Sequence, residues 1–154
     1  MATATNARQV IGDLEKWAEA TGQDLGQAVA SAALDVIRLT IKRTPVDEGR
    51  LRGNWQTTIN RPAMGEIDRI DKSGNKVLAE AARVARSFKE GSIWFVNNTS
   101  YSTVVEFGLY PSTETEKTSG GFSKLAPRGM LRVSVAEFDA AIRKAIREAN
   151  QSRQ

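Results

Sequence analysis

One short segment, residues 44–53, most strongly constrains the path of this chain. Proline cannot continue a helix and pushes the residue before it out of the helical region, so Pro45 must end the helix that precedes it. Gly49 tolerates the backbone conformations that a tight turn requires. Residues 54–60 then alternate apolar and polar side chains, as a strand does. The segment therefore predicts a turn that redirects the chain from a helix into a sheet.

Four stretches have the apolar spacing of amphipathic helices. They are residues 7–20, residues 24–43 with Asp24 as the N-cap, residues 76–88 and a C-terminal stretch. The C-terminal pattern is the clearest, because apolar residues step by four and three from Leu131 to Ala149 and Pro127 lies near its start.

The segments between these helices predict a few strands and two loops. Residues 93–96 form a continuous apolar run, which favours a buried strand. Residues 101–107 fit either a short strand or a helical turn. Residues 66–75 are charged and predict an exposed excursion. Residues 109–127 are rich in Pro, Ser, Thr and Gly, which is typical of a flexible loop.

Helices therefore flank a few strands, and this order predicts an α+β fold. We expect a small antiparallel or mixed sheet packed against helices, with long N-terminal and C-terminal helices. A chain of 154 residues is long enough to bury a core as a single domain, residues 1–154. Residues 1–24 are expected to form a helical arm. Trp17, Trp55 and Trp94 lie in apolar patterns and are expected in the core.

The composition excludes several kinds of chemistry. The chain has no cysteine and no histidine, so it has no disulfide, no thiolate nucleophile, no imidazole base and no Cys/His zinc site. Its net charge of +4 suits either an ordinary surface or weak attraction to nucleic acid or an acidic partner. No apolar stretch approaches the ~20 residues of a membrane span, so no membrane contact is expected.

Two charged features have competing interpretations. Arg50 and Arg52 follow Asp47 and fit either a phosphate-facing patch or solvated charge that neighbouring carboxylates neutralise. Glu106 stands between apolar residues, where a carboxylate either acts as a general acid or base, pairs with an arginine or caps backbone donors. Pairing or capping is favoured, because burying an isolated charge is costly, and an ion pair with Arg50 or Arg52 is the expected form.

Three motifs in a fixed order resemble a family of phage tail components. Residues 44–52 read TPVDEGRLR and are similar to the family box TPVDTGRLR, with Glu48 where the family commonly has threonine. An Asn-Thr-Ser-Tyr segment ending at Tyr101 leads into VEFG at residues 105–108, and APRGML follows at residues 126–131. The family comprises neck, tail-completion and head–tail joining proteins, including lambda-type minor tail protein Z. The resemblance covers residues 28–149.

The resemblance implies a structural virion protein of the neck or tail that has no cofactor and no enzymatic activity. It implies that the protein completes the tail and joins it to the head by forming a ring, sixfold or twelvefold, at the tail–connector junction. The implied partners are other copies of the chain, tail-tube or terminator proteins, head-connector proteins and, without sequence preference, DNA in the lumen. The implied location is the virion, and the host cytoplasm during assembly.

The assembly interface is expected at residues of the three motifs. These residues are Pro45, Asp47, Gly49, Arg50, Arg52, Tyr101, Glu106, Phe107, Pro127 and Arg128. Two alternatives stay open. One is a tail terminator that caps the tail tube, and the other, from a different class, is a DNA-binding accessory protein.

Overall fold

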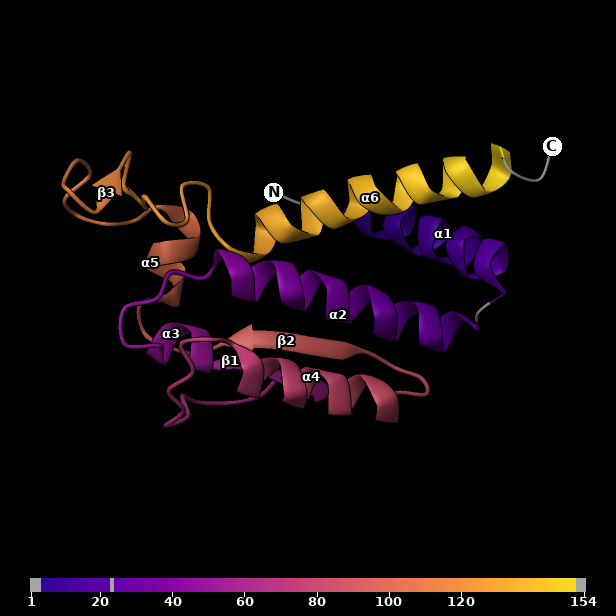
Figure 1. Ribbon diagram of the computed structural model, residues 1–154, viewed down its shortest axis with the longest axis horizontal. Coiled ribbons are helices and arrows are strands. Elements are labelled where there is room, and N and C mark those ends of the chain that lie inside the picture. Colours follow the sequence, from indigo (N-terminus) through magenta and orange to yellow (C-terminus); the bar gives the residue numbers. More distant parts are fainter. Residues whose placement is uncertain (1–3, 23, 152–154) are drawn as a thin grey trace.

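The computed structural model describes residues 4–22 and 24–151. Three long helices, α1 (Ala4–Thr21), α2 (Leu25–Arg43) and α6 (Leu131–Gln151), dominate it. Helix α2 runs through the middle of the molecule, with α1 and α6 on one side and the elements labelled β1, β2 and α4 on the other, while α5 and β3 lie beyond one end of it (Figure 1). The predicted helices at both ends of the chain are therefore confirmed.

The boundaries of α2 follow from its end residues. Asp24 is the N-cap, and its Oδ1 accepts a hydrogen bond from the backbone nitrogen of Gln27 at 2.9 Å. At the other end, the backbone of Thr44 is extended, as expected of a residue that precedes proline. Both predicted ends of this helix are confirmed.

The main sheet has two antiparallel strands, β1 (Trp55–Ile59) and β2 (Ile93–Asn97), with Thr57 opposite Phe95. Helix α4 (Asn75–Ser87) packs against β1 and α2. The rings of Trp55 and Phe95 stack with their centroids 4.5 Å apart. The buried core that joins these elements consists of Ile37, Ile41, Leu51, Trp55, Val77, Ala81, Val105, Ala126 and Met130.

Four short elements complete the chain. Helix α3 (Arg50–Gly53) leads into β1, and α5 (Ser102–Phe107) follows β2. The ambiguous residues 101–107 are thus helical rather than extended. Strands β3 (Thr118–Ser119) and β4 (Phe122–Ser123) form a small hairpin that projects from the body of the molecule (Figure 1). The α+β fold with small antiparallel sheets is confirmed, and the flexibility of this loop before assembly stays a prediction.

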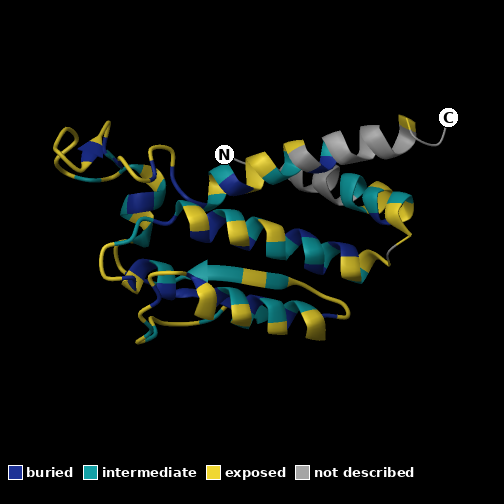
Figure 2. Cartoon of the chain, in the orientation of Figure 1, coloured by how far each residue is buried: buried dark blue, intermediate teal, exposed yellow. Residues whose placement is uncertain are grey.

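Two burial predictions are wrong. Strand β2 is only partly buried along its length (Figure 2), and Trp94 is 41% exposed, although an apolar run there predicted a buried strand. Among the residues that the structure describes, this sheet has two strands, so no further strand lies beside β2. Trp55, in contrast, is in the core as predicted.

Residues 66–75 are not a simple exposed excursion, because Asp71 is 4% exposed. Its carboxylate accepts hydrogen bonds from the backbone nitrogens of Gly74 and Val77 at 3.0 and 3.1 Å, and from Ser73 Oγ at 3.1 Å. Burial acts to raise the pKa of Asp71, but these hydrogen bonds outweigh it and hold the pKa below its ordinary value. Asp71 therefore fastens the segment to the first turn of α4. None of the helices in the described residues is long and apolar enough to cross a membrane.

Candidate assembly surface

The turn at residues 44–53 is built around Gly49, as the sequence predicts. Gly49 has φ +95°, and an added Cβ would lie 2.7 Å from the backbone nitrogen of Lys72. Its carbonyl oxygen accepts hydrogen bonds from the backbone nitrogens of Gly53 at 2.9 Å and Asp71 at 3.0 Å. The glycine thus lets the turn, α3 and the segment before α4 pack together.

The side chain of Arg52 stabilises this turn. Its guanidinium donates to the carbonyl oxygens of Lys72 at 2.6 Å and Thr44 at 2.8 Å, and burial lowers its pKa. Thr44 Oγ1 in turn accepts a hydrogen bond from Trp55 Nε1 at 2.9 Å. Arg52 therefore ties the turn to neighbouring backbone.

Arg50 points the other way, toward the surface. Its guanidinium pairs with Glu66 at 2.7 Å and lies 3.9 Å from Asp68, and the hydrogen bond to Glu66 raises its pKa. The predicted neutralisation of Arg50 is present, but the carboxylates come from residues 66–68 rather than from Asp47 and Glu48. Both of those residues are exposed.

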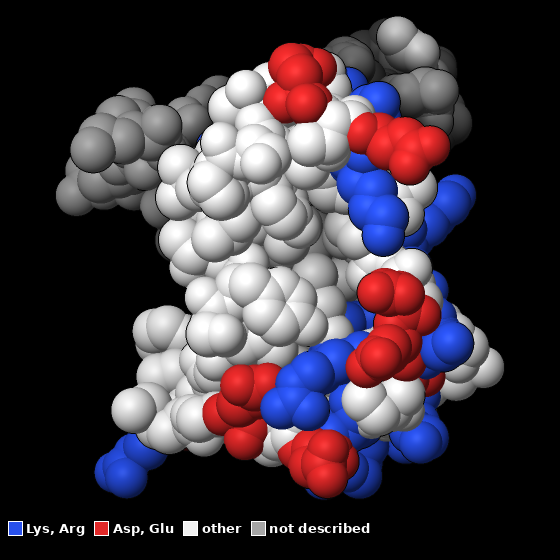
Figure 3. Space-filling view, turned by 90° about the vertical axis from the view of Figure 1, so that its left-hand side faces the viewer, with Lys and Arg blue, Asp and Glu red and all other residues white. Residues whose placement is uncertain are grey.

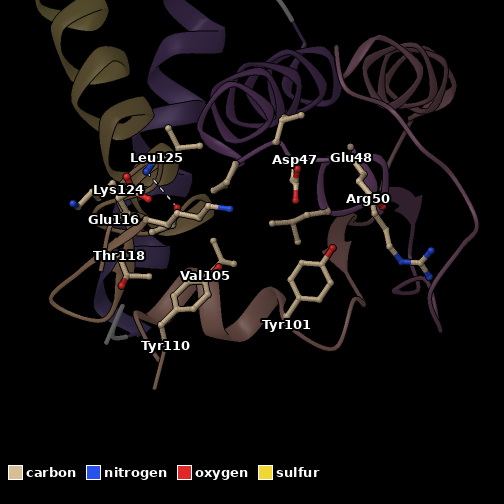
Figure 4. Close-up of a pocket in the computed structure, with 16 residues that line it drawn as sticks. Asp47, Glu48, Arg50, Tyr101, Val105, Tyr110, Glu116, Thr118, Lys124 and Leu125 are labelled. Carbon is tan, nitrogen blue, oxygen red and sulfur yellow. Dashed lines mark hydrogen bonds between the residues drawn. The ribbon is translucent and has the colours of Figure 1, made fainter. Parts of the chain in front are cut away.

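A groove of about 610 Å³ opens beside this turn. One wall is the turn itself, the second is α5 with Tyr101 and Val105, and the third is the segment of the hairpin from Tyr110 to Leu125 (Figure 4). On this side of the molecule, charged side chains gather along one flank while much of the remaining surface is uncharged (Figure 3). The groove therefore combines a rim that carries side chains of both charges with apolar walls.

Two large side chains of the groove are open to solvent. Leu125 is 68% exposed, and Tyr101 is 39% exposed. Burial of part of the ring raises the pKa of the Tyr101 hydroxyl, although nearby Arg50 opposes the shift. Apolar and aromatic side chains gathered in a concave surface are typical of a contact that another chain completes.

The structure divides the ten predicted interface residues into three sets. Five of them line the groove: Pro45, Asp47, Gly49, Arg50 and Tyr101. Arg52 is used inside the turn, and the other four belong to the junction between α5 and α6: Glu106, Phe107, Pro127 and Arg128.

Glu106 caps α6, and the expected ion pair with Arg50 or Arg52 is wrong. Its carboxylate accepts hydrogen bonds from the backbone nitrogens of residues 130, 131 and 132 at 2.8 to 3.0 Å, and from Arg132 Nε at 3.1 Å. The first turn of a helix carries backbone donors without intrahelical acceptors, and a carboxylate satisfies them well. Glu106 therefore both caps backbone donors and pairs with an arginine, and that arginine is Arg132.

Phe107 and Gly129 support the same junction. The guanidinium of Arg132 lies 4.4 Å from the ring centre of Phe107, which is itself 50% exposed. Gly129 has φ +93°, and an added Cβ would lie 2.5 Å from the carbonyl oxygen of Glu106. Pro127 and Arg128 are exposed just before α6. The second and third motifs thus meet in space to start this helix.

The prediction missed the hairpin wall of the groove. Tyr110, Glu116, Thr118 and Lys124 line it together with Leu125. These residues lie in a segment whose composition gives no periodic signal. The clue available in the sequence was a few large apolar residues, among them Tyr110 and Leu125, within an otherwise polar stretch. Within residues 4–22 and 24–151, no cluster of His, Cys, Asp or Glu side chains is arranged to hold a metal ion.

Comparison with known proteins gives one match. The family model described as "Bacteriophage HK97-gp10, putative tail-component" matches residues 8–108. The matched region contains the turn at residues 44–53, both strands of the main sheet and α5. No curated protein and no solved structure matches the chain significantly.

Proposed function

Because this chain belongs to the HK97-gp10-like family of phage tail components, we propose that it completes the tail and joins it to the head as a ring at the neck. It is a structural protein in this proposal, and other copies of the chain, tail-tube or terminator proteins and head-connector proteins are its partners. It acts in the virion, after assembly in the host cytoplasm.

The groove is the observation that carries this proposal. Its first two walls come from residues inside the matched family region, whereas its third wall comes from the hairpin beyond residue 108. A groove and a projecting hairpin on one molecule suit a head-to-tail contact, in which a different surface of the next copy enters the groove. Contacts of this heterologous kind close into rings when the rotation between copies allows it.

The test uses a phage that lacks this gene and is complemented with variants. Leu125→Asp places a charge in the groove at a side chain that is 68% exposed, so the fold should tolerate it. Met64→Asp is the matched control, because Met64 is 86% exposed and does not line the groove. We expect Leu125→Asp to keep its melting temperature and to lose most of the plaque titre, while Met64→Asp restores titre. Full titre from a folded Leu125→Asp protein would refute the role of the groove.

Electron microscopy of the particles separates tail completion from the terminator alternative. Tails of normal length that fail to join heads support completion, whereas overlong tails support a terminator. The DNA-binding alternative predicts that the purified protein binds duplex DNA with an affinity that falls steeply with salt. Residues 50–90 hold nine Lys or Arg and five Asp or Glu, a net charge of +4 that equals the net charge of the whole chain. This concentration of positive charge is a reason to test the DNA-binding alternative.

A further inference from the structure

The two strands of the main sheet differ at their outer edges, because side chains form hydrogen bonds with outward backbone groups of β1. Glu80 Oε1 accepts a hydrogen bond from the backbone nitrogen of Thr57 at 3.0 Å. Arg69 Nη2 donates to the carbonyl oxygen of Trp55 at 2.6 Å, and Arg69 and Glu80 are themselves paired at 2.7 Å. This ion pair offers the carbonyl oxygen of Trp55 and the backbone nitrogen of Thr57 the donor and acceptor that a further strand would offer, so the β1 edge is blocked at these two residues.

These contacts also reveal which backbone groups of β2 face outward. In an antiparallel ladder, opposed residues alternate between pairs that exchange hydrogen bonds and pairs whose groups point away. Because Trp55 and Thr57 point away from β2, their opposites Asn97 and Phe95 point away from β1, and so does Ile93. Two other hydrogen bonds are consistent with this alternation. Asn60 N donates to Ser92 O at 2.8 Å, as a pair that faces inward would, and Ser102 Oγ donates to the outward carbonyl oxygen of Asn97 at 3.1 Å.

The outward backbone N–H and C=O groups of Ile93 and Phe95 have no such side-chain partner in the described residues. In the part of the chain that the structure describes, no hydrogen bond other than those of the ladder reaches the backbone of these two residues. The strand Ile93–Trp94–Phe95–Val96 contains no charge and no proline. Natural edge strands normally carry one of these to prevent pairing, so this edge is suited to accept another strand.

We propose that β2 pairs with β2 of a second copy, antiparallel and about a twofold axis, to form a four-stranded sheet. Ile93 of each copy lies opposite the second copy's Phe95, and the two Trp94 residues face each other on the axis. This register satisfies all four outward groups of Ile93 and Phe95 on each chain. A register centred on Phe95 would instead require the carbonyl oxygen of Asn97, which Ser102 already occupies.

A second copy is favoured over another partner because the edge is complementary to itself. The free donors and acceptors lie on two alternate residues, and a twofold axis between them matches each donor with an acceptor. Glu90, a charged residue close to the strand, falls opposite the neutral Asn98 of the second copy in this register. Trp94, which is 41% exposed in the monomer, gains an aromatic neighbour. A two-stranded sheet is only marginally stable alone, and pairing with a second copy gives a four-stranded sheet.

Amide hydrogen exchange of the purified protein tests this pairing directly. We expect the amides of Ile93 and Phe95 to exchange at least tenfold more slowly at millimolar than at low micromolar protein, as the dimer forms. The amides of Trp94 and Val96 face β1 and should be protected at both concentrations. Rapid exchange of Ile93 and Phe95 at every concentration would overturn the proposal, and so would protection that is independent of concentration.

Disulfide formation provides a second test, because the chain has no cysteine of its own. Opposed residues that do not exchange hydrogen bonds have Cα atoms about 4.5 Å apart, which a disulfide can span. Trp94→Cys should therefore link two copies on mild oxidation. Val96→Cys is the matched control on the same face, since two Val96 residues would lie about 13 Å apart at the rise of a strand.

The Cys variants should first be shown to keep the circular dichroism spectrum of the parent and to react with a soluble thiol reagent. Equal cross-linking of Trp94→Cys and Val96→Cys would refute the register, and no cross-linking of either would refute the pairing. The dimer needs no other tail component, so its presence or absence in the pure protein is independent of the neck function proposed above.

Discussion

Glu106→Gln is the substitution whose effect follows most directly from the structure. The carboxylate accepts four hydrogen bonds, three from the backbone at the start of α6 and one from Arg132. Its side chain is 12% exposed, so water replaces these contacts poorly. Glutamine has nearly the same shape, but it carries one acceptor oxygen, and its amide group would face the remaining donors.

The size of the effect can be estimated from the lost interactions. Removing a negative charge from a helix N-terminus costs about 0.5–1 kcal/mol. Leaving partly buried donors without an acceptor costs about 1–3 kcal/mol. The free energy of unfolding should therefore fall by about 1.5–4 kcal/mol. In a protein of this size each 1 kcal/mol lowers the melting temperature by about 2–4 °C, which gives a decrease of about 3–16 °C.

Thermal and urea unfolding, followed by circular dichroism, measure this loss. Glu19→Gln is the matched control, because Glu19 is exposed on α1, away from the junction of α5 and α6. It should change the melting temperature by less than about 2 °C. If Glu106→Gln were as stable as Glu19→Gln, the capping contacts would not stabilise α6, and the argument for this junction would fail.

Three further predictions concern the turn, the cap of α4 and the hairpin. Asp71→Ala removes the acceptor of the first turn of α4 and should lower the free energy of unfolding by about 2 kcal/mol at neutral pH. The pKa of Asp71 is lowered in the folded protein, so its contribution to the free energy of unfolding is present above the unfolded pKa of about 4 and disappears as the pH falls through the folded pKa. Urea titrations should therefore show a smaller difference in the free energy of unfolding between Asp71→Asn and the parent at pH 2.5 than at pH 7. Gly49→Ala should cost about 2 kcal/mol or more, measured by thermal unfolding, because φ is +95° and the Cβ would meet Lys72; Gly65→Ala, at φ +76° with no atom within 4 Å of its Cβ, separates backbone strain from this close contact. Deleting residues 112–121 should leave a folded protein that no longer completes virions, and wild-type titre from that deletion would contradict a role for the hairpin.

The helices could be predicted from the sequence because their signals are local. A cap at Asp24, a stop at Pro45 and a periodic apolar face determine α2 within a few residues of chain. The same holds for the turn at Gly49, whose positive φ is the feature that glycine supplies. These are short-range requirements of the backbone, and any structure containing these residues must meet them.

The partners of Glu106 and Asp71 could not be predicted in the same way. Glu106 was correctly expected to need donors, but the donors lie 24–26 residues further along the chain, and Arg50 was as plausible from spacing alone. Asp71 lies in a polar segment, where composition suggests exposure and burial depends on how the segment folds back onto α4. The groove escaped prediction in part because its third wall is a hairpin without periodicity. Such contacts depend on the tertiary fold.

The two proposed contacts differ in symmetry, and this difference limits the assemblies that one chain can form. Pairing through β2 uses the same edge on both copies, so it closes after two and cannot extend. The groove receives a different surface of the next copy, so it can repeat around a ring. A closed sixfold ring in which every copy also pairs through β2 would contain twelve chains, whereas a ring built through the groove alone would leave six unprotected edges. Since β1 is sealed by Arg69 and Glu80, β2 is the edge of the main sheet through which strands can be added, and occupation of that edge would decide between the two stoichiometries.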